Sequence, residues 1–164
     1  MYPLLKVCDQ ASFESCDLNV DYAFVVSIQN KGVYPAVLRP DFRGRRIDLY
    51  FDDVVEGPTA PRPIDIEALF AFARDEWLPE VRRNFLTFRT IIHCGAGVSR
   101  SGAAALLLLS LYFGSYAAAA IHLYRTAPQV APNALMCRLI FEKLGPAYGP
   151  DIFAALAEGK AQAT

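Results

Sequence analysis

Residues 91–101, which read Ile-Ile-His-Cys-Gly-Ala-Gly-Val-Ser-Arg-Ser, constrain the fold of this chain more than any other segment. A β-branched pair, Ile91 and Ile92, leads into a short loop of mostly small residues, and an uncharged Ala/Leu-rich run follows the loop. This order predicts a buried strand, a tight loop and a helix that is apolar all round and therefore buried. A strand, loop and buried helix in succession are typical of α/β folds.

The loop carries two chemically active side chains, Cys94 and Arg100, six positions apart. Backbone N–H groups at a helix start can point inward and hold the oxygens of an anion. A guanidinium can add a two-pronged contact to two of those oxygens, and the same donors stabilise a thiolate. We therefore expect an oxyanion site with a nucleophilic thiol at its base, and we expect these residues to bind the anion: Gly95, Ala96, Gly97, Val98, Ser99 and Arg100.

Two other motifs that contain glycine are excluded by their spacing. Gly95-Ala96-Gly97 begins like a dinucleotide fingerprint, but that pattern needs a glycine where Arg100 stands and an acidic residue about 20 positions later. Residues 101–141 contain no Asp or Glu. A serine-nucleophile elbow, Gly-x-Ser-x-Gly, fails because Ser101 occupies its last position.

The nine residues from His93 to Ser101 resemble the His-Cys-x-x-Gly-x-Ser-Arg-Ser signature of cysteine-dependent protein phosphatases. The likeness is strongest to the compact dual-specificity phosphatases and their bacterial relatives. It implies that Cys94 attacks phosphorus and that Arg100 binds the phosphoryl oxygens. It also implies that the Ser101 hydroxyl eases departure of the thiolate when the phosphocysteine is hydrolysed. The reaction so implied uses no metal and no cofactor.

Hydrolysis of a phosphate ester also needs an acid that protonates the leaving oxygen. In the resembled family this acid is an Asp on a loop some tens of residues before the Cys. Asp53, followed by Val54, matches the strand end of bacterial relatives and is the expected acid. Asp52, which strand alternation places opposite Phe51, and Glu56 remain alternatives.

Three further residues are expected to support the loop. His93 should hydrogen-bond the loop backbone and hold its amides inward. Asn133 resembles the Asn of a Pro-Asn pair that opens a late helix in relatives, where its amide braces neighbouring loops, although helix capping alone would explain it. Ser99 either contributes to the loop or caps the helix.

The hydrophobic patterns predict an α/β fold with a central, mostly parallel sheet of about four or five strands flanked by helices. A helical turn is expected at 12–15, and Asp65 is expected to cap a helix that Pro79 kinks or ends. The resemblance covers residues 3–145, and we expect residues 1–164 to form a single dual-specificity-phosphatase-like domain. The predicted strands span 4–7, 22–28, 45–53 and 90–93, and the later helices span 101–113, 115–126, 132–144 and 150–158.

Composition excludes several classes of function. A net charge of −1 does not favour nucleic-acid binding. Four cysteines without a Cys-x-x-Cys pair, and only two histidines, offer no zinc pattern. Residues 102–121 carry no charge, but Gly114-Ser115 predicts a helix stop and a restart, so two buried helices are expected instead of a membrane span. A reactive thiol and an N-terminus without a signal-peptide pattern predict a cytoplasmic protein.

The expected substrate is a phosphorylated protein or peptide. The resemblance implies a pocket shallow enough for phosphotyrosine and for phosphoserine or phosphothreonine. The loop interior contains no Lys, which disfavours phosphoinositides. Three other readings stay open: a catalytically silent phospho-binding module, a phosphatase for a non-protein phosphate ester, and rhodanese-like or arsenate-reducing chemistry. One cluster of basic residues is expected to be a solvated charged surface, with contact to an acidic substrate as the alternative; it comprises Arg39, Arg43, Arg45 and Arg46.

Overall fold

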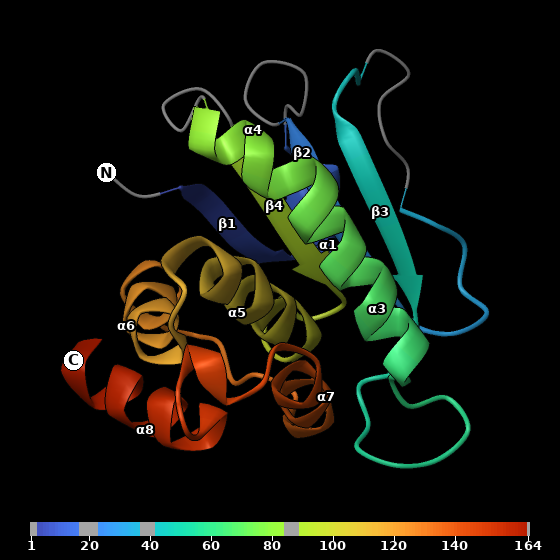
Figure 1. Ribbon diagram of the computed structural model, residues 1–164. Coiled ribbons are helices and arrows are strands. Elements are labelled where there is room, and N and C mark those ends of the chain that lie inside the picture. The colour runs from blue at the N-terminus through green and yellow to red at the C-terminus, as the bar shows by residue number, and fades with distance from the viewer. Residues whose placement is uncertain (1–2, 17–22, 37–41, 84–88, 164) are drawn as a thin grey trace.

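A computed structural model describes residues 3–16, 23–36, 42–83 and 89–163 of the chain. Its centre is a parallel sheet in which the strand order is β1-β4-β2-β3 (Figure 1). The four strands that the described residues form are β1 (Leu4–Asp9), β2 (Phe24–Gln29), β3 (Arg45–Tyr50) and β4 (Arg89–Cys94). The predicted α/β class and the parallel sheet are confirmed.

The two inner strands, β2 and β4, are almost entirely buried. Parallel strands covered on both faces read as continuous apolar runs, which explains the unbroken β-branched pair before the loop. Ile92 faces the larger core cluster together with Val26, whereas Ile91 faces a smaller cluster with Val25 and Phe13.

Helices cover the two faces of the sheet very unequally. One face carries α5 and a long helical stretch made of α3, η1 and α4, and the C-terminal helices pack beyond α5 (Figure 1). Among the described residues, the other face is covered by α1 and by the segment that follows β2. The bounds are α1 (Gln10–Glu14), α3 (Pro63–Phe72), the π-helical η1 (Ala73–Trp77), α4 (Leu78–Arg83), α5 (Arg100–Phe113), α6 (Tyr116–Thr126), α7 (Ala134–Leu144), the 3₁₀ turn η2 (Pro146–Tyr148) and α8 (Ile152–Ala163).

The break predicted inside the uncharged run is confirmed. Gly114 adopts the left-handed conformation with φ +67° and ends α5, and the Ser115 side chain accepts a hydrogen bond from the Ala118 N–H at the start of α6. The twelve residues from Arg100 to Leu111 are all buried. Within the described part of the chain, every helix is too short or too polar to cross a bilayer.

The structure corrects the predicted start of the helix in residues 63–83 and excludes one alternative for Pro79. Asp65 is not the cap, because Pro63 begins the helix and Asp65 instead accepts a hydrogen bond from the Arg62 N–H at 2.8 Å. Proline suits the first helical position because its missing N–H would have no helical partner there. Of the two alternatives for Pro79, the helix end is excluded, because α4 continues to Arg83. The helix is irregular just before Pro79, where η1 forms a π-helical turn.

The third strand is shorter than the alternation over 45–53 predicts. It ends at Tyr50, and the Asp52 N–H bonds to the Thr59 carbonyl at 2.8 Å, across its own loop. The alternation itself is confirmed, because Leu49 and Phe51 both lie in the larger core cluster. Asp52 and Asp53 therefore lie in a loop at the carboxyl edge of the sheet, the edge at which β4 also ends.

Candidate active site

The loop between β4 and α5 is held against the end of β1. Gly97 has φ +68°, and a Cβ built there would lie 2.3 Å from the Cys8 carbonyl carbon and 2.4 Å from the Asp9 nitrogen. Only glycine satisfies both the left-handed backbone and this close approach. The β1–β4 register, which pairs Asp9 with Cys94, brings the two segments together.

Carbonyl groups of the loop point outward to N–H groups of neighbouring segments. The Gly95 carbonyl accepts from the Gln10 N–H at 3.3 Å, and the Val98 carbonyl accepts from the Ala131 N–H at 3.1 Å. The Ser99 carbonyl is likewise used, by Ala103 in α5 and by Asn133. These carbonyl oxygens bind groups outside the loop, so the N–H groups of the loop remain available to an anion in its interior.

Cys94 lies at the base of the loop and is 1% exposed. Its Sγ is 3.2 Å from the Ser101 Oγ. Burial acts to raise the pKa of this thiol, but hydrogen bonds from the Ser101 hydroxyl and from the backbone N–H groups of Ser101, Val98 and Gly97 outweigh it, so the pKa is lowered. Burial without such donors raises the pKa of Cys137 to about 12. The loop thus favours a thiolate at one buried cysteine.

Alkylation of Cys94 should therefore begin at a lower pH than alkylation of an ordinary thiol. The thiolate is the reactive form, so the rate of iodoacetate modification follows the thiolate fraction. We expect the inflection at Cys94 to lie clearly below the usual value of about 8.5. Peptide mass spectrometry separates this site from the other cysteines. Ser101→Ala removes one donor and should move the inflection upward, and a wild-type inflection at or above the usual value would contradict the proposed thiolate.

Arg100 is 5% exposed and is anchored from behind. Its Nη1 donates to the Asn30 Oδ1 at 2.7 Å and to the Phe51 carbonyl at 2.8 Å. Its Nη2 lies over Gly95, 3.5 Å from where a Cβ would stand. Its Nε is buried and has no hydrogen-bond partner among the described residues. A buried donor without a partner is costly, so this edge of the guanidinium is suited to an oxyanion bound in the loop.

Asp53 is joined directly to the loop. Its Oδ1 accepts hydrogen bonds from the Ser99 Oγ at 2.6 Å and from the Asn133 Nδ2 at 2.9 Å. Asn133 also caps α7, because its Oδ1 accepts from the Met136 N–H at 3.0 Å. Ser99 occupies the N-cap position of α5, but its side chain makes no capping hydrogen bond and binds Asp53 instead. Both of these hydrogen bonds to the carboxylate are accepted by Oδ1.

The carboxylate of Asp52 has hydrogen-bond partners that differ from those of Asp53. Hydrogen bonds from the Thr59 side chain and from the Lys31 N–H, 3.1 Å from Oδ1, lower the pKa of Asp52, and the positive charge of Arg100 lowers it further. A carboxylate stabilised in its charged form is a poor proton donor. Asp52 therefore braces two loops, and Glu56, the third alternative, is exposed in the same loop.

His93 does not make the predicted hydrogen bond to the loop backbone. Neither ring nitrogen has a partner among the described residues, and the ring stacks on Phe13 at a centroid distance of 3.8 Å. The cause is strand alternation, which sends Cys94 toward the α5 face and His93 toward the α1 face. Burial, aided by the charge of Arg46, lowers the pKa of His93 to about 4, so the imidazole is neutral at pH 7. It supports the strand by packing.

The basic cluster does not line the site. Arg45 and Arg46 open β3, at the opposite end of this strand from Asp53. Arg45 pairs with Glu76 at 3.2 Å, and Arg46 pairs with Asp48. Arg43 precedes the strand, and Arg39 lies outside the described residues. These positions favour the expected solvated surface over contact with an acidic substrate at Cys94.

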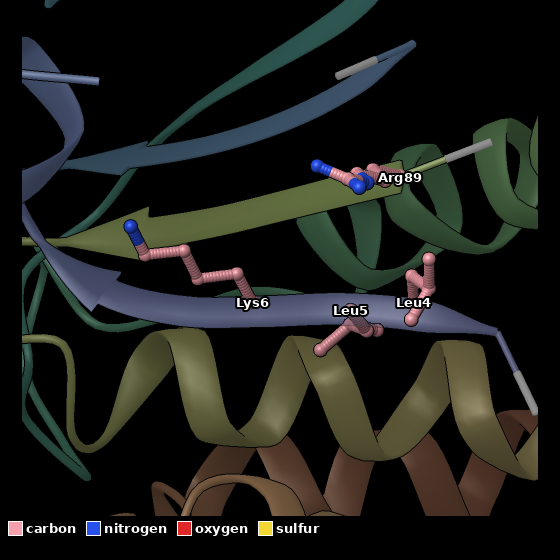
Figure 2. A pocket seen from close by; sticks show the side chains of 4 residues that line it. All are labelled: Leu4, Leu5, Lys6 and Arg89. Atoms are coloured by element: carbon pink, nitrogen blue, oxygen red, sulfur yellow. The ribbon is translucent and has the colours of Figure 1, made fainter. Parts of the chain in front are cut away.

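A cavity of about 250 Å³ lies elsewhere, at the amino ends of β1 and β4. Figure 2 shows that Leu4, Leu5, Lys6 and Arg89 line it. None of these residues belongs to the loop around Cys94. The candidate active site is thus the loop at the carboxyl edge of the sheet.

Sequence reasoning missed two contacts of this site. Asn30 reaches Arg100 because it directly follows β2, and β2 lies beside β4. Its place at a strand's carboxyl end, the edge at which α/β sheets bind ligands, was the available signal. The bond from Ser99 to Asp53 had no sequence signal, because it joins residues 46 positions apart.

The sequence matches no protein-family model, and no curated protein matches it. The structure is similar to human DUSP28, with a TM-score of 0.62 and 17% identity over 89% of this chain and 90% of that one. It is also similar to the Cydia pomonella PTP-2 phosphatase, with a TM-score of 0.62 and 19% identity over 87% of this chain and 91% of that one.

A third similar structure is PTPMT1 in complex with PI(5)P, with a TM-score of 0.54 and 12% identity over 77% of this chain and 78% of that one. At sequence identities this low, the structural similarity establishes the fold alone. The likeness to bacterial members stays a prediction. The arrangement of the sheet, the loop after β4 and the surrounding helices shows that this chain has the fold of the compact dual-specificity cysteine phosphatases.

Proposed function

We propose that this protein is a cysteine-dependent phosphatase that hydrolyses phosphomonoesters through a phosphocysteine intermediate, with residues 1–164 forming one catalytic domain. One observation carries the proposal: the free, buried edge of Arg100 lies in the same loop as a thiol whose pKa is lowered. A guanidinium edge and inward amides fit a doubly charged oxyanion, and a thiolate below them fits attack on phosphorus.

In the first step the Cys94 thiolate attacks phosphorus and the bond to the leaving oxygen breaks. Arg100 and the loop amides stabilise the three equatorial oxygens, whose charge and geometry change in the transition state. Asp53, which Ser99 and Asn133 hold beside the loop, gives its proton to the departing oxygen. The products are the free alcohol or phenol and a phosphorylated Cys94.

In the second step water attacks the phosphocysteine and the S–P bond breaks. Asp53, now ionised, takes a proton from the water. The Ser101 hydroxyl, 3.2 Å from Sγ, donates to the sulfur and stabilises the thiolate that leaves. Phosphate is released, and neither step needs a metal or a cofactor.

The proposed substrate is a phosphorylated protein or peptide that carries phosphotyrosine, with phosphoserine and phosphothreonine as further substrates. Similarity to phosphatases named as dual-specificity enzymes supports this class. The loop interior contributes no Lys that could bind further phosphates of an inositol ring. A reducing compartment such as the cytoplasm suits a reactive thiolate. The presence of Cys94, Arg100 and a docked Asp53 favours an active enzyme over a silent binding module.

A comparison of Asp53→Asn with Asp52→Asn across leaving groups tests this function. General acid catalysis contributes roughly 10²–10⁴-fold when the departing oxygen is basic. Asp53→Asn should therefore slow hydrolysis of phosphotyrosine and phosphoserine by this factor and act only mildly on esters of very acidic phenols. Because the acid must be protonated in the first step, its loss should also remove the basic limb of the pH–rate profile.

Asp52→Asn is the matched control. It keeps the oxygen that accepts from the Lys31 N–H, so all substrates should slow by a similar, small factor. A leaving-group dependence that follows Asp52 would reassign the acid. If neither variant shows one, the acid is Glu56 or absent, and the silent-module reading gains support.

A further inference from the structure

Asn30 occupies a position from which it controls Arg100. It is the first residue after β2, and its backbone carbonyl accepts a hydrogen bond from the Val33 N–H at 3.2 Å, which closes a turn. Its side-chain Oδ1 accepts from the Arg100 Nη1 at 2.7 Å, although the two residues lie 70 positions apart. The turn fixes the backbone of Asn30, and the backbone in turn places the acceptor.

Nη1 carries two hydrogens, and the structure gives it two acceptors. The Asn30 Oδ1 comes from the end of β2, and the Phe51 carbonyl comes from the end of β3. Two acceptors on one nitrogen set the plane of a guanidinium, because the group is rigid and flat. The opposite edge, formed by Nε and Nη2, is then directed into the loop, where Nε is buried without a partner.

We propose that Asn30 is a positioning residue that orients the guanidinium of Arg100 toward the phosphoryl oxygens. This inference rests on the proposed phosphatase function. Without Oδ1 a single acceptor remains, and the guanidinium can rotate about that bond. Loss of the groups that orient metal ligands costs about 10- to 100-fold in activity, and we expect a loss of the same order for a group that orients Arg100. Because a two-pronged contact tightens in the transition state, the loss should appear mainly in kcat.

Steady-state kinetics on p-nitrophenyl phosphate test the proposal with three variants. Asn30→Ala should lower kcat by about 10- to 100-fold. Asn30→Asp retains an oxygen acceptor and should keep most of kcat, while its negative charge raises KM. Tyr34→Ala is the control, because Tyr34 lies in the same segment after β2 and is 90% exposed. It should behave as the wild type. If Asn30→Ala does not fold, Asn30→Gln, which displaces the acceptor, replaces it.

A double-mutant cycle on binding of tungstate, a tetrahedral oxyanion, shows whether Asn30 acts through Arg100. Calorimetry should show weaker binding for Asn30→Ala than for the wild type. In the Arg100→Lys background the same change should have almost no effect, because the two-pronged contact is already lost. A purely structural role would weaken binding equally in both backgrounds.

Equal kcat for Asn30→Ala and the wild type, or an equal loss of tungstate affinity in both backgrounds, would overturn the role of Asn30. Failure of the proposed function looks different: the wild type would release no phosphate from any monoester. The tungstate cycle would still report on the contact between Asn30 and Arg100 in that case, so the two failures are distinguishable.

Discussion

Replacement of Cys94 with Ser is expected to abolish turnover and to leave the fold and oxyanion binding intact. The hydroxyl oxygen occupies nearly the same space as the sulfur, so the loop keeps its shape and its inward amides. A serine hydroxyl, however, stays protonated at neutral pH, whereas hydrogen bonds from Ser101, Val98 and Gly97 lower the pKa of the Cys94 thiol. The nucleophile is therefore lost while the anion site remains.

Phosphate release from p-nitrophenyl phosphate, together with tungstate binding, measures both parts of this expectation. Cys137→Ser is a useful control, because Cys137 is also fully buried but lies in α7 and takes no part in the proposed chemistry. It should stay active as far as the protein remains folded. Residual activity of Cys94→Ser above a few per cent of the wild-type rate would mean that another group is the nucleophile.

Arg100→Lys is expected to lower kcat/KM by several orders of magnitude even though the positive charge is preserved. The guanidinium uses one nitrogen for two anchors, Asn30 and Phe51, and still has an edge free for two phosphoryl oxygens. A lysine ammonium is a compact charge, so it cannot bind the two anchors and two phosphoryl oxygens at the same time. The missing contact is one that strengthens in the transition state, so the loss should lie in the chemical step.

Steady-state kinetics on an aryl phosphate check this result, and circular dichroism confirms that the variant is folded. Near-normal activity in Arg100→Lys would mean that charge alone attracts the substrate. The anchored fork would then have no catalytic purpose, and the inference about Asn30 would fail with it.

The catalytic loop could be predicted from the sequence because its requirements are local. Each local pattern predicts its own backbone conformation: the β-branched pair at 91–92 favours a strand, the small residues that follow favour a tight loop, and the charge-free run after them favours a buried helix. Gly114 and Ser115 likewise mark a helix end and a helix start by their own chemistry. The structure confirms these elements within one residue at their ends.

Features that depend on partners distant in sequence could not be predicted as well. The third strand ends early because Thr59 competes for the Asp52 N–H. His93 lost its predicted partner because Phe13 covers the face toward which it points. The ion pair between Arg45 and Glu76 joins residues 31 positions apart and likewise has no signal in the sequence.

Trapping the covalent intermediate tests the proposed phosphocysteine mechanism most directly. The enzyme is mixed with an aryl phosphate in excess chelator, quenched in denaturant during turnover, digested and analysed by mass spectrometry. We expect one phosphoryl group on Cys94, absent in Cys94→Ser and absent without substrate. Turnover without any phosphoryl group on Cys94, or with the group on another residue, would contradict this mechanism.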